Sequence, residues 1–471
     1  LWVPTELGAY YFKKPPFFNW VLILFSKLPG GFSAFNVRLP TVLSTFGIAW
    51  IMYALGKAYV SKAFGELSAL LFLSCGAILF YFSTLAEIDL FYSFITFASF
   101  AALFHFYRQE KYHLLFLAVY FLGAIGTLTK GLPSIIFTGW SVFVFLLSEK
   151  DWRRLFSGAH FLGMGLYLLI VGGYLWIYAR QAPIGGLLET IWGENTERTV
   201  AENGFGKTLS HLIAFPFDLL KDLIPGALLL VFVIRRGFVS LIRSQKLVQF
   251  AVLLAVANFL PYWISPGARM RYIYMLFPLF FMMLAAFYLN RDGLSPRRMN
   301  IFRSAVTFLL TILVPASLAL PFLPDLSDLN YLNWLAPVFA LSFASLAWHA
   351  FNKPTFALTA LIIGTAVGRI LFDIVVLPQR AFNSAALEEK QLAEKIHEIT
   401  GQEPLYVWQS ERISFTTIVY LDKWREVPVK LTPGFKNSPA YYFGCREDMQ
   451  FPYRELLSFV YNDDEFVLFR Q

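Results

Sequence analysis

Residues 88–107 read IDLFYSFITFASFAALFHFY, an apolar stretch in which Asp89 is the one Asp, Glu, Lys or Arg. An α-helix needs about 20 apolar residues to cross a bilayer, and this stretch has that length. Eleven comparable stretches cover 40–59, 65–83, 113–128, 132–148, 158–179, 223–235, 247–264, 271–290, 302–323, 332–351 and 355–378. None alternates as a β-barrel strand does. The sequence therefore predicts a polytopic α-helical membrane protein.

Composition excludes several other classes of protein. Hydrophobic residues make up 57% of the 471 residues and charged residues 15%, whereas soluble domains carry about 25% charge. This hydrophobicity also excludes a disordered chain and argues against nucleic acid as a partner. The two cysteines, Cys75 and Cys445, are too few for a disulfide framework or a cysteine-based metal site.

Basic residues predict the orientation of the chain in the membrane. The loops on one side carry sixteen Lys and Arg residues, and the inter-span loops on the other side carry seven. Because basic loops stay in the cytoplasm, the first side is predicted to be cytoplasmic. Residues 1–39, the loop 180–222 and the tail 379–471 are then predicted to lie outside.

Three domains follow from this pattern. Residues 1–39 form an outer-face loop, in which 17–28 are predicted to lie as an interfacial helix. Residues 40–378 form the membrane domain. Residues 379–471 lack a long apolar run, and they show helical spacing at 384–399 followed by short strand-like runs. We expect a small extracytoplasmic α/β domain there.

Charged residues at the outer membrane edge are the candidate functional residues, because each carries a desolvation cost there. Lys13 and Lys14 precede the interfacial helix, where they are suited to a phosphate or to ordinary headgroup anchoring. Glu87 and Asp89 lie at a short outer hairpin. Asp89 is suited to binding a metal, accepting a proton or orienting a sugar hydroxyl, or to capping a helix. Lys130 lies in another outer turn, where snorkelling explains it equally well.

Two further groups lie in longer outer segments. Glu194 and Arg198 belong to the loop 180–222, which either covers a pocket or is simply solvated. Arg269 and Arg271 open a predicted span, followed by Tyr274. Cations at a helix N-terminus are unfavourable unless an anion is bound, so a phosphate site is favoured over a structural role.

Remaining motifs exclude other chemistry. Arg369 and Asp373 are four residues apart inside the last span, where a self-neutralising structural pair is the simplest explanation. The six histidines lack metal-ligand spacing, and there is no Walker, GxGxxG or GxSxG motif. Nucleotide-driven transport and serine hydrolysis therefore lack support.

Taken in order, these segments resemble a known family. The similar segments are residues 2–4 (WVP), 11–16 (YFKKPP), 35–40 (FNVRLP), 88–91 (IDLF), 126–131 (GTLTKG), 194–198 and 269–274. They resemble membrane glycosyltransferases of the dolichyl-phosphate-mannose protein mannosyltransferase type. Bacterial members include 4-amino-4-deoxy-L-arabinose (lipid A) transferases.

The resemblance implies a C-type glycosyltransferase fold of thirteen spans followed by an external domain. Twelve spans lie in this chain, and we expect one more upstream of Leu1, together with the family's main catalytic acid in an Asp-Glu motif. By resemblance, Asp89 matches a second acidic position. Lys14, Arg198 and Tyr274 match substrate-binding positions.

The resemblance also implies an inverting transfer of a sugar from a polyprenyl-phosphate donor at the outer face of the bacterial inner membrane. Lys13, Lys14, Lys130, Glu194, Arg198, Arg269, Arg271 and Tyr274 would bind the substrate. Lys13 and Asn195 replace a Glu and a His of the aminoarabinose enzymes, so the residues present do not support a divalent metal.

Other functions remain open. The acceptor is either a lipid of the lipid A type or a protein, as in protein O-mannosyltransferases. A lipid-linked-sugar flippase would also need outer basic residues, but it is expected to show internal repeats that this chain lacks. A non-catalytic lipid-binding homologue is the third possibility.

Overall fold

The computed structural model describes residues 2–196, 200–235, 237–291, 295–326, 329–382, 385–409, 413–449, 451–461 and 464–471. The chain forms two compact units. The first contains Trp2 and residues 12–372, and the second contains residues 3–11 and 373–471.

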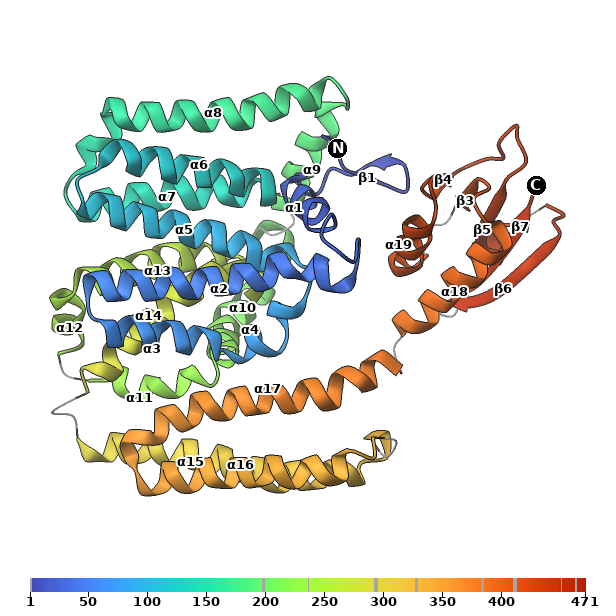
Figure 1. Ribbon diagram of the computed structural model, residues 1–471. Helices are drawn as coiled ribbons and strands as arrows, with labels where there is room; N and C mark the ends of the chain where they lie inside the picture. The colour runs from blue at the N-terminus through green and yellow to red at the C-terminus, as the bar shows by residue number, and fades with distance from the viewer. Residues whose placement is uncertain are drawn as a thin grey trace. The chain divides into compact units, whose positions relative to one another are not determined.

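The first unit is helical, and its long helices run roughly parallel to one another (Figure 1). Its α-helices are α1 (Phe17–Phe25), α2 (Ala34–Tyr59), α3 (Lys62–Leu73), α4 (Gly76–Phe80), α5 (Ile88–Arg108), α6 (Tyr112–Lys130), α7 (Leu132–Ser148), α8 (Gly158–Ala179), α9 (Ile184–Thr196), α10 (Val200–Asp222), α11 (Leu230–Val233), α12 (Phe238–Ser244), α13 (Lys246–Ile264), α14 (Phe277–Leu289), α15 (Pro296–Ala319), α16 (Leu332–Asn352) and α17 (Ala357–Phe382). Its 3₁₀ helices are η1 (Phe82–Thr84), η2 (Trp152–Phe156), η3 (Gly226–Leu229), η4 (Met270–Leu276), η5 (Leu320–Phe322), η6 (Pro324–Leu326) and η7 (Pro354–Phe356).

The predicted spans are largely confirmed. Within the described ranges, nine helices are long and apolar enough to cross a membrane. The pair of α3 with the segment from α4 to η1 makes a tenth if this pair, bent by 50°, is one span. The predicted span 132–148 is the shorter apolar helix α7. The first unit is therefore a multi-pass membrane domain.

The span predicted at 223–235 is wrong as a single helix. Proline inside a helix removes a backbone hydrogen bond and kinks or breaks the helix, and Pro225 separates α10 from the 3₁₀ turn η3. This turn runs into α11, which is one turn of α-helix, and the helical backbone ends at Ile234. The apolar composition of these residues reflects burial, since Leu229 and Phe232 are almost fully enclosed.

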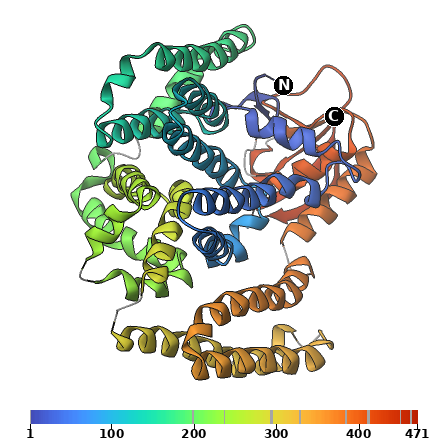
Figure 2. The ribbon, with the colours of Figure 1, turned by 60° about the vertical axis from the view of Figure 1, so that its left-hand side comes forward.

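Close helix packing in the first unit depends on small residues. A Cβ atom at Gly56 of α2 would lie 2.5 Å from the Cα atom of Gly65 in α3, so the two backbones nearly touch. This is the small-residue packing typical of membrane helices. Figures 1 and 2 both show α15, α16 and α17 side by side. A Cβ atom at Gly364 of α17 would lie 2.5 Å from Cδ2 of Leu310, so this glycine makes room for the leucine side chain.

The predicted interfacial helix is present as α1, and a side chain fixes the turn that follows it. Asn36, in the first turn of α2, is buried, and its side-chain amide donates to the carbonyls of Leu28, Pro29 and Gly31. Ser33 caps α2 by accepting a hydrogen bond from the Asn36 backbone N–H. These hydrogen bonds fix the turn between α1 and α2. They therefore help to set the position of α1, which Lys13 and Lys14 directly precede.

The second unit is the small α/β domain expected in the tail. Its strands β3 (Leu405–Trp408), β4 (Lys430–Thr432), β5 (Tyr441–Cys445), β6 (Glu455–Tyr461) and β7 (Asp464–Arg470) form a sheet in the order β4-β3-β5-β7-β6. Strand β3 is parallel to β4 and β5, whereas β7 is antiparallel to β5 and β6. Helices α18 (Ala385–Thr400) and α19 (Phe415–Trp424) share a buried core with one face of this sheet, and η8 (Arg446–Asp448) follows β5.

An N-terminal hairpin also belongs to the second unit. Strands β1 (Thr5–Glu6) and β2 (Ala9–Tyr10) pair antiparallel. The backbone N–H of Leu431, in β4, donates to the carbonyl of Leu7 at the hairpin tip over 2.8 Å. Outer-loop residues that the sequence assigns to a single domain, 1–39, thus lie in both units.

Candidate functional site

Asp89 is held at the start of α5. Glu87 is the N-cap residue and makes no side-chain capping bond, and Asp89 follows in the first turn. A carboxylate in this position is stabilised by the helix dipole. Asp89 is not the cap itself, so the capping explanation for this acid is wrong.

Lys130 is the main partner of Asp89. Its Nζ atom lies 2.5 Å from Oδ1 of Asp89, and the two side chains are only 8% and 7% exposed. The rings of Tyr92 and Tyr272 lie 5.0 Å and 4.9 Å from the same nitrogen, within cation–π range. Lys130 is therefore a buried, enclosed cation, and the snorkelling explanation is wrong.

Arg271 is the second cation beside Asp89. Its Nε atom lies 3.8 Å from Oδ2 of Asp89, and its Nη1 atom lies 3.5 Å from Oε2 of Glu87. The side chain is 31% exposed. Two carboxylates thus lie beside Arg271 at the start of its helix. Their negative charges offset part of the unfavourable interaction between a cation and a helix N-terminus, which was the reason to expect a bound anion.

Not every predicted residue lies at this cluster. Arg269 precedes η4, and its side chain is exposed and does not line the cavity described below. Tyr274 is buried between the rings of Phe82 and Phe277, and its hydroxyl donates to Asp222 over 3.4 Å. Burial raises the pKa of Asp222, the last residue of α10, above its ordinary value.

The loop 180–222 is described only in part. Glu194 lies in α9, and its side chain is outside the described residues. Arg198 lies outside them altogether. The structure therefore neither places these two side chains at the site nor separates them from it.

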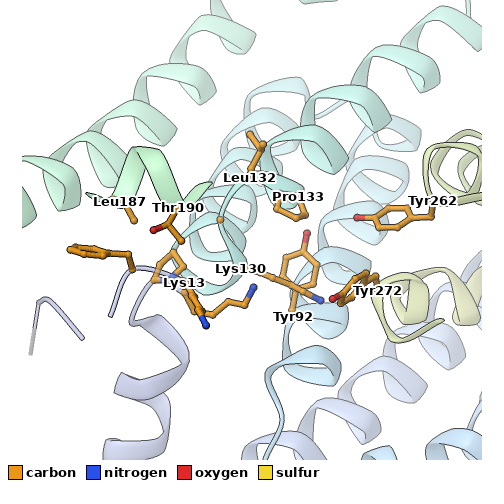
Figure 3. A pocket seen from close by; sticks show the side chains of 13 residues that line it. Lys13, Tyr92, Lys130, Leu132, Pro133, Leu187, Thr190, Tyr262 and Tyr272 are labelled. Atoms are coloured by element: carbon orange, nitrogen blue, oxygen red, sulfur yellow. The ribbon is translucent and has the colours of Figure 1, made fainter. Parts of the chain in front are cut away.

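Three of the predicted lysines line one cavity of about 50 Å³. Its lining residues are Phe12, Lys13, Lys14, Pro15, Tyr92, Lys130, Gly131, Leu132, Pro133, Leu187, Thr190, Tyr262 and Tyr272. Figure 3 shows Tyr92 and Tyr272 on the side of the cavity opposite Lys13. The lining comes from the segment before α1 and from α5, α6, α7, α9, α13 and η4, so it is assembled from across the sequence.

The chemistry of this lining favours an anion. Its acid–base side chains are three lysines and three tyrosines, and the hydroxyl of Thr190 adds a further hydrogen-bonding group. The negative charge of Asp89 is directed at Lys130 and Arg271. Ammonium and hydroxyl groups around a small cavity are donors that suit phosphate oxygens.

Several lining residues were missed from the sequence. Tyr92 lies one helical turn after Asp89, and Tyr272 directly follows Arg271, so both were adjacent to residues already singled out. Tyr262 and Thr190 carry no comparable signal, because they reach the cavity from α13 and α9 through tertiary packing alone.

Metal-ligand side chains gather elsewhere. Among the described residues, Cys445, Glu447 and Asp464 have ligand atoms within 4.8 Å of one another, and all three belong to the second unit. At the cavity, Lys13 carries an ammonium group, which has no lone pair for a metal.

Solved structures share this arrangement of helices. Two structures of ArnT from Cupriavidus metallidurans, one in the apo state and one bound to undecaprenyl phosphate, superpose with a TM-score of 0.67. The match covers 100% of this chain and 90% of each of theirs, at 16% and 17% identity. The chain has the ArnT fold. This confirms the C-type glycosyltransferase fold expected from the sequence.

Sequence comparison supports the same relationship over part of the chain. Residues 13–177 match the family model described as dolichyl-phosphate-mannose-protein mannosyltransferase. No curated protein sequence matches significantly. The resemblance inferred from the ordered motifs is therefore confirmed, and the matched region contains Lys13, Lys14, Asp89 and Lys130 of the candidate site.

Proposed function

We propose that this protein is a glycosyltransferase that takes a sugar from a polyprenyl-phosphate donor at the outer membrane face and transfers it to a lipid or other acceptor. The observation that carries the proposal is the cavity lined by Lys13, Lys14 and Lys130. The match to a glycosyltransferase family and the ArnT fold support it, since one of the ArnT structures is bound to undecaprenyl phosphate.

The reaction is a displacement at the anomeric carbon. An acceptor oxygen forms a bond to this carbon, and the bond between the carbon and the phosphate oxygen breaks. The polyprenyl phosphate leaves with the bonding electron pair, while a general base takes the acceptor proton. Charge accumulates on the leaving phosphate, and stabilising such charge is usually the largest catalytic term. The three lysines are suited to this role.

Asp89 acts through its neighbours in this proposal. Its carboxylate lies 2.5 Å from the Lys130 ammonium group and 3.8 Å from the Arg271 guanidinium group, so both of its oxygens face cations. Its geometry suits a positioning role, in which it holds Lys130 between the rings of Tyr92 and Tyr272. Asp89, expected to be catalytic, is therefore proposed here as a residue that orients a cation.

Lipid A-type lipids and proteins are the two acceptor classes that fit. We favour a lipid acceptor because the fold is shared with ArnT over the full length of this chain. We also propose an inner-membrane location with the second unit outside, which is the orientation that the distribution of basic loops predicts.

A binding titration with a short-chain polyprenyl phosphate tests the proposal. Losing a hydrogen bond to a charged group costs about 1.5–3 kcal/mol. Lys14→Ala should therefore weaken binding by about tenfold to a hundredfold, and Lys13→Ala should act in the same direction. Arg297→Ala, at an exposed arginine in the first turn of α15, is the matched control and should bind like the wild type.

A second assay distinguishes a transferase from a flippase by measuring the release of free polyprenyl phosphate from a polyprenyl-phosphate sugar. A transferase releases the carrier when an acceptor is present, whereas a flippase moves the donor intact. If the lysine variants bind like Arg297→Ala, the cavity is not the phosphate site, and the proposal fails.

A further inference from the structure

The hydroxyl group of Tyr92 is enclosed within the first unit and lacks a hydrogen bond. Tyr92 is 1% exposed, and its hydroxyl has no hydrogen-bond partner among the described residues. The hydroxyls of Thr96 and Ser134 lie nearby without hydrogen-bonding geometry to it, and that of Ser134 donates to the Gly123 carbonyl over 3.0 Å. Burying a hydroxyl without a partner is unfavourable, so this group needs an explanation.

Tyr92 shares its side of the cavity with a second tyrosine. Tyr92 and Tyr262 both line the cavity, and Figure 3 shows the Tyr262 hydroxyl directed toward Tyr92. The ring of Tyr262 stacks on Phe137, with centroids 5.5 Å and planes 7° apart. Nζ of Lys130 lies 5.0 Å from the Tyr92 ring. Packing thus holds both rings, and their hydroxyl groups occupy defined positions.

The positive charge of the lining is unevenly distributed. Figure 3 shows Lys13 on the side of the cavity opposite Tyr92 and Tyr272. On the tyrosine side, the charge of Lys130 is offset by Asp89, 2.5 Å away. The side of Lys13 therefore suits the phosphate, whereas the tyrosine side suits a neutral group. Tyrosine hydroxyls both donate and accept hydrogen bonds, as the hydroxyl groups of a sugar do.

We propose that Tyr92 and Tyr262 bind a hydroxyl group of the donor sugar, while the lysines hold the phosphate. The inference rests on the proposed function, and it names the residues that recognise the sugar. The Tyr92 hydroxyl is already removed from water in the folded protein. A hydrogen bond to the sugar therefore satisfies this hydroxyl without a further desolvation cost on the protein side.

Such a subsite also serves the displacement reaction. The bond that breaks lies between the sugar and the phosphate. Holding the phosphate at one side of the cavity and a sugar hydroxyl at the other fixes the direction of this bond. A fixed direction favours attack by an acceptor oxygen, because orientation of the reacting groups lowers the barrier.

Thermal unfolding of the full chain in detergent provides the first test. Tyr92→Phe removes the unpartnered hydroxyl and keeps the ring, so the Tm should equal or exceed that of the wild type. Tyr120→Phe is the matched control, because the Tyr120 hydroxyl is hydrogen-bonded to Nε2 of His160 at 2.5 Å. Loss of this bonded hydroxyl should lower the Tm.

Binding titrations provide the second test. The probes are a short-chain polyprenyl phosphate and the same carrier linked to mannose or to 4-amino-4-deoxy-L-arabinose. The Kd of the bare carrier divided by that of a sugar-linked carrier measures what the sugar contributes. Loss of one hydrogen bond should lower this ratio about fivefold in Tyr92→Phe, and Tyr262→Phe should act in the same direction.

Two further variants separate the sugar from the phosphate. Lys14→Ala should weaken the binding of bare and sugar-linked carriers together and keep the wild-type ratio. Tyr120→Phe should change neither Kd, since Tyr120 does not line the cavity. The tyrosine and lysine variants should therefore affect different parts of the same ligand.

The outcomes distinguish the two proposals. Equal weakening of all probes in Tyr92→Phe would assign its hydroxyl to the phosphate and overturn the sugar subsite. An unchanged ratio, a lowered Tm of Tyr92→Phe, or a wild type that binds neither sugar-linked carrier better than the bare one would also overturn it. A wild type that binds none of the probes overturns the proposed function instead.

Discussion

Asp89 faces Lys130 and Arg271 at once, and this double pairing explains why a buried acid is tolerated at the membrane edge. The attraction between buried charges only roughly offsets their desolvation. Removing one partner, however, leaves the other uncompensated. The pair with Lys130 is therefore a point at which stability and the proposed substrate binding are linked.

Asp89→Asn should lower the free energy of unfolding by about 3–5 kcal/mol, the usual cost of breaking a buried ion pair. Glu87→Gln removes the same charge from a side chain that is 36% exposed and lies 3.5 Å from Arg271, so its effect should stay below about 1 kcal/mol. Thermal unfolding in detergent measures both. Equal effects of the two changes would contradict the buried-pair assignment.

The double variant Asp89→Asn/Lys130→Met sharpens this test. With both charges gone, much of the lost stability should return, because no unpaired ion is left buried. Phosphate binding should stay weak, since a cavity lysine has been removed. Stability and binding would then respond differently in the same protein.

At the residue scale, the sequence singled out individual charges but not their pairing. Asp89, Lys130 and Arg271 were each singled out, because a charge at the edge of an apolar stretch is costly and needs a reason. Their pairing could not be predicted, since Asp89 and Lys130 come from different helices. Tyr274 was carried over by resemblance, and the structure brings its neighbour Tyr272 to the cavity instead.

Helix contacts through glycine give a prediction at the scale of elements. A Cβ atom at Gly65 would lie 2.5 Å from the Tyr53 carbonyl oxygen, so Gly65→Val must push α3 away from α2. Overpacking of this kind costs about 1–3 kcal/mol. Gly172→Val, in α8, is the control because no atom lies within 4 Å of the added carbon. Thermal unfolding should separate the two variants.

Elements were predictable where length and composition decide them. The long apolar stretches became helices, and the tail formed α18 and short strands near the predicted runs. Residues 223–235 were wrongly predicted as one span, because an apolar run of this length does not distinguish a continuous helix from a 3₁₀ turn followed by one turn of α-helix. Strands β1 and β2 have two residues each, which is too short for any periodic signal.

At the scale of the whole molecule, the orientation in the membrane stays a prediction. Lys395 is exposed on α18, and the native cysteines are buried. Lys395→Cys should therefore react with an impermeant thiol reagent in intact cells. Arg297→Cys, on the predicted cytoplasmic side, should react only after permeabilisation. The reverse pattern would invert the topology and move the lysine cavity to the wrong face for an external acceptor.

The hydrogen bond between Leu431 and Leu7 also sets an order of events during biosynthesis. All of the described spanning helices lie between these two residues in the sequence, so the hairpin leaves the ribosome early and its strand arrives late. Domains fold largely in the order in which they are synthesised. The newly made hairpin therefore lacks its hydrogen-bond partner on β4 until the last unit has been completed. A chain interrupted in translation would therefore carry the hairpin without the strand to which it is hydrogen-bonded.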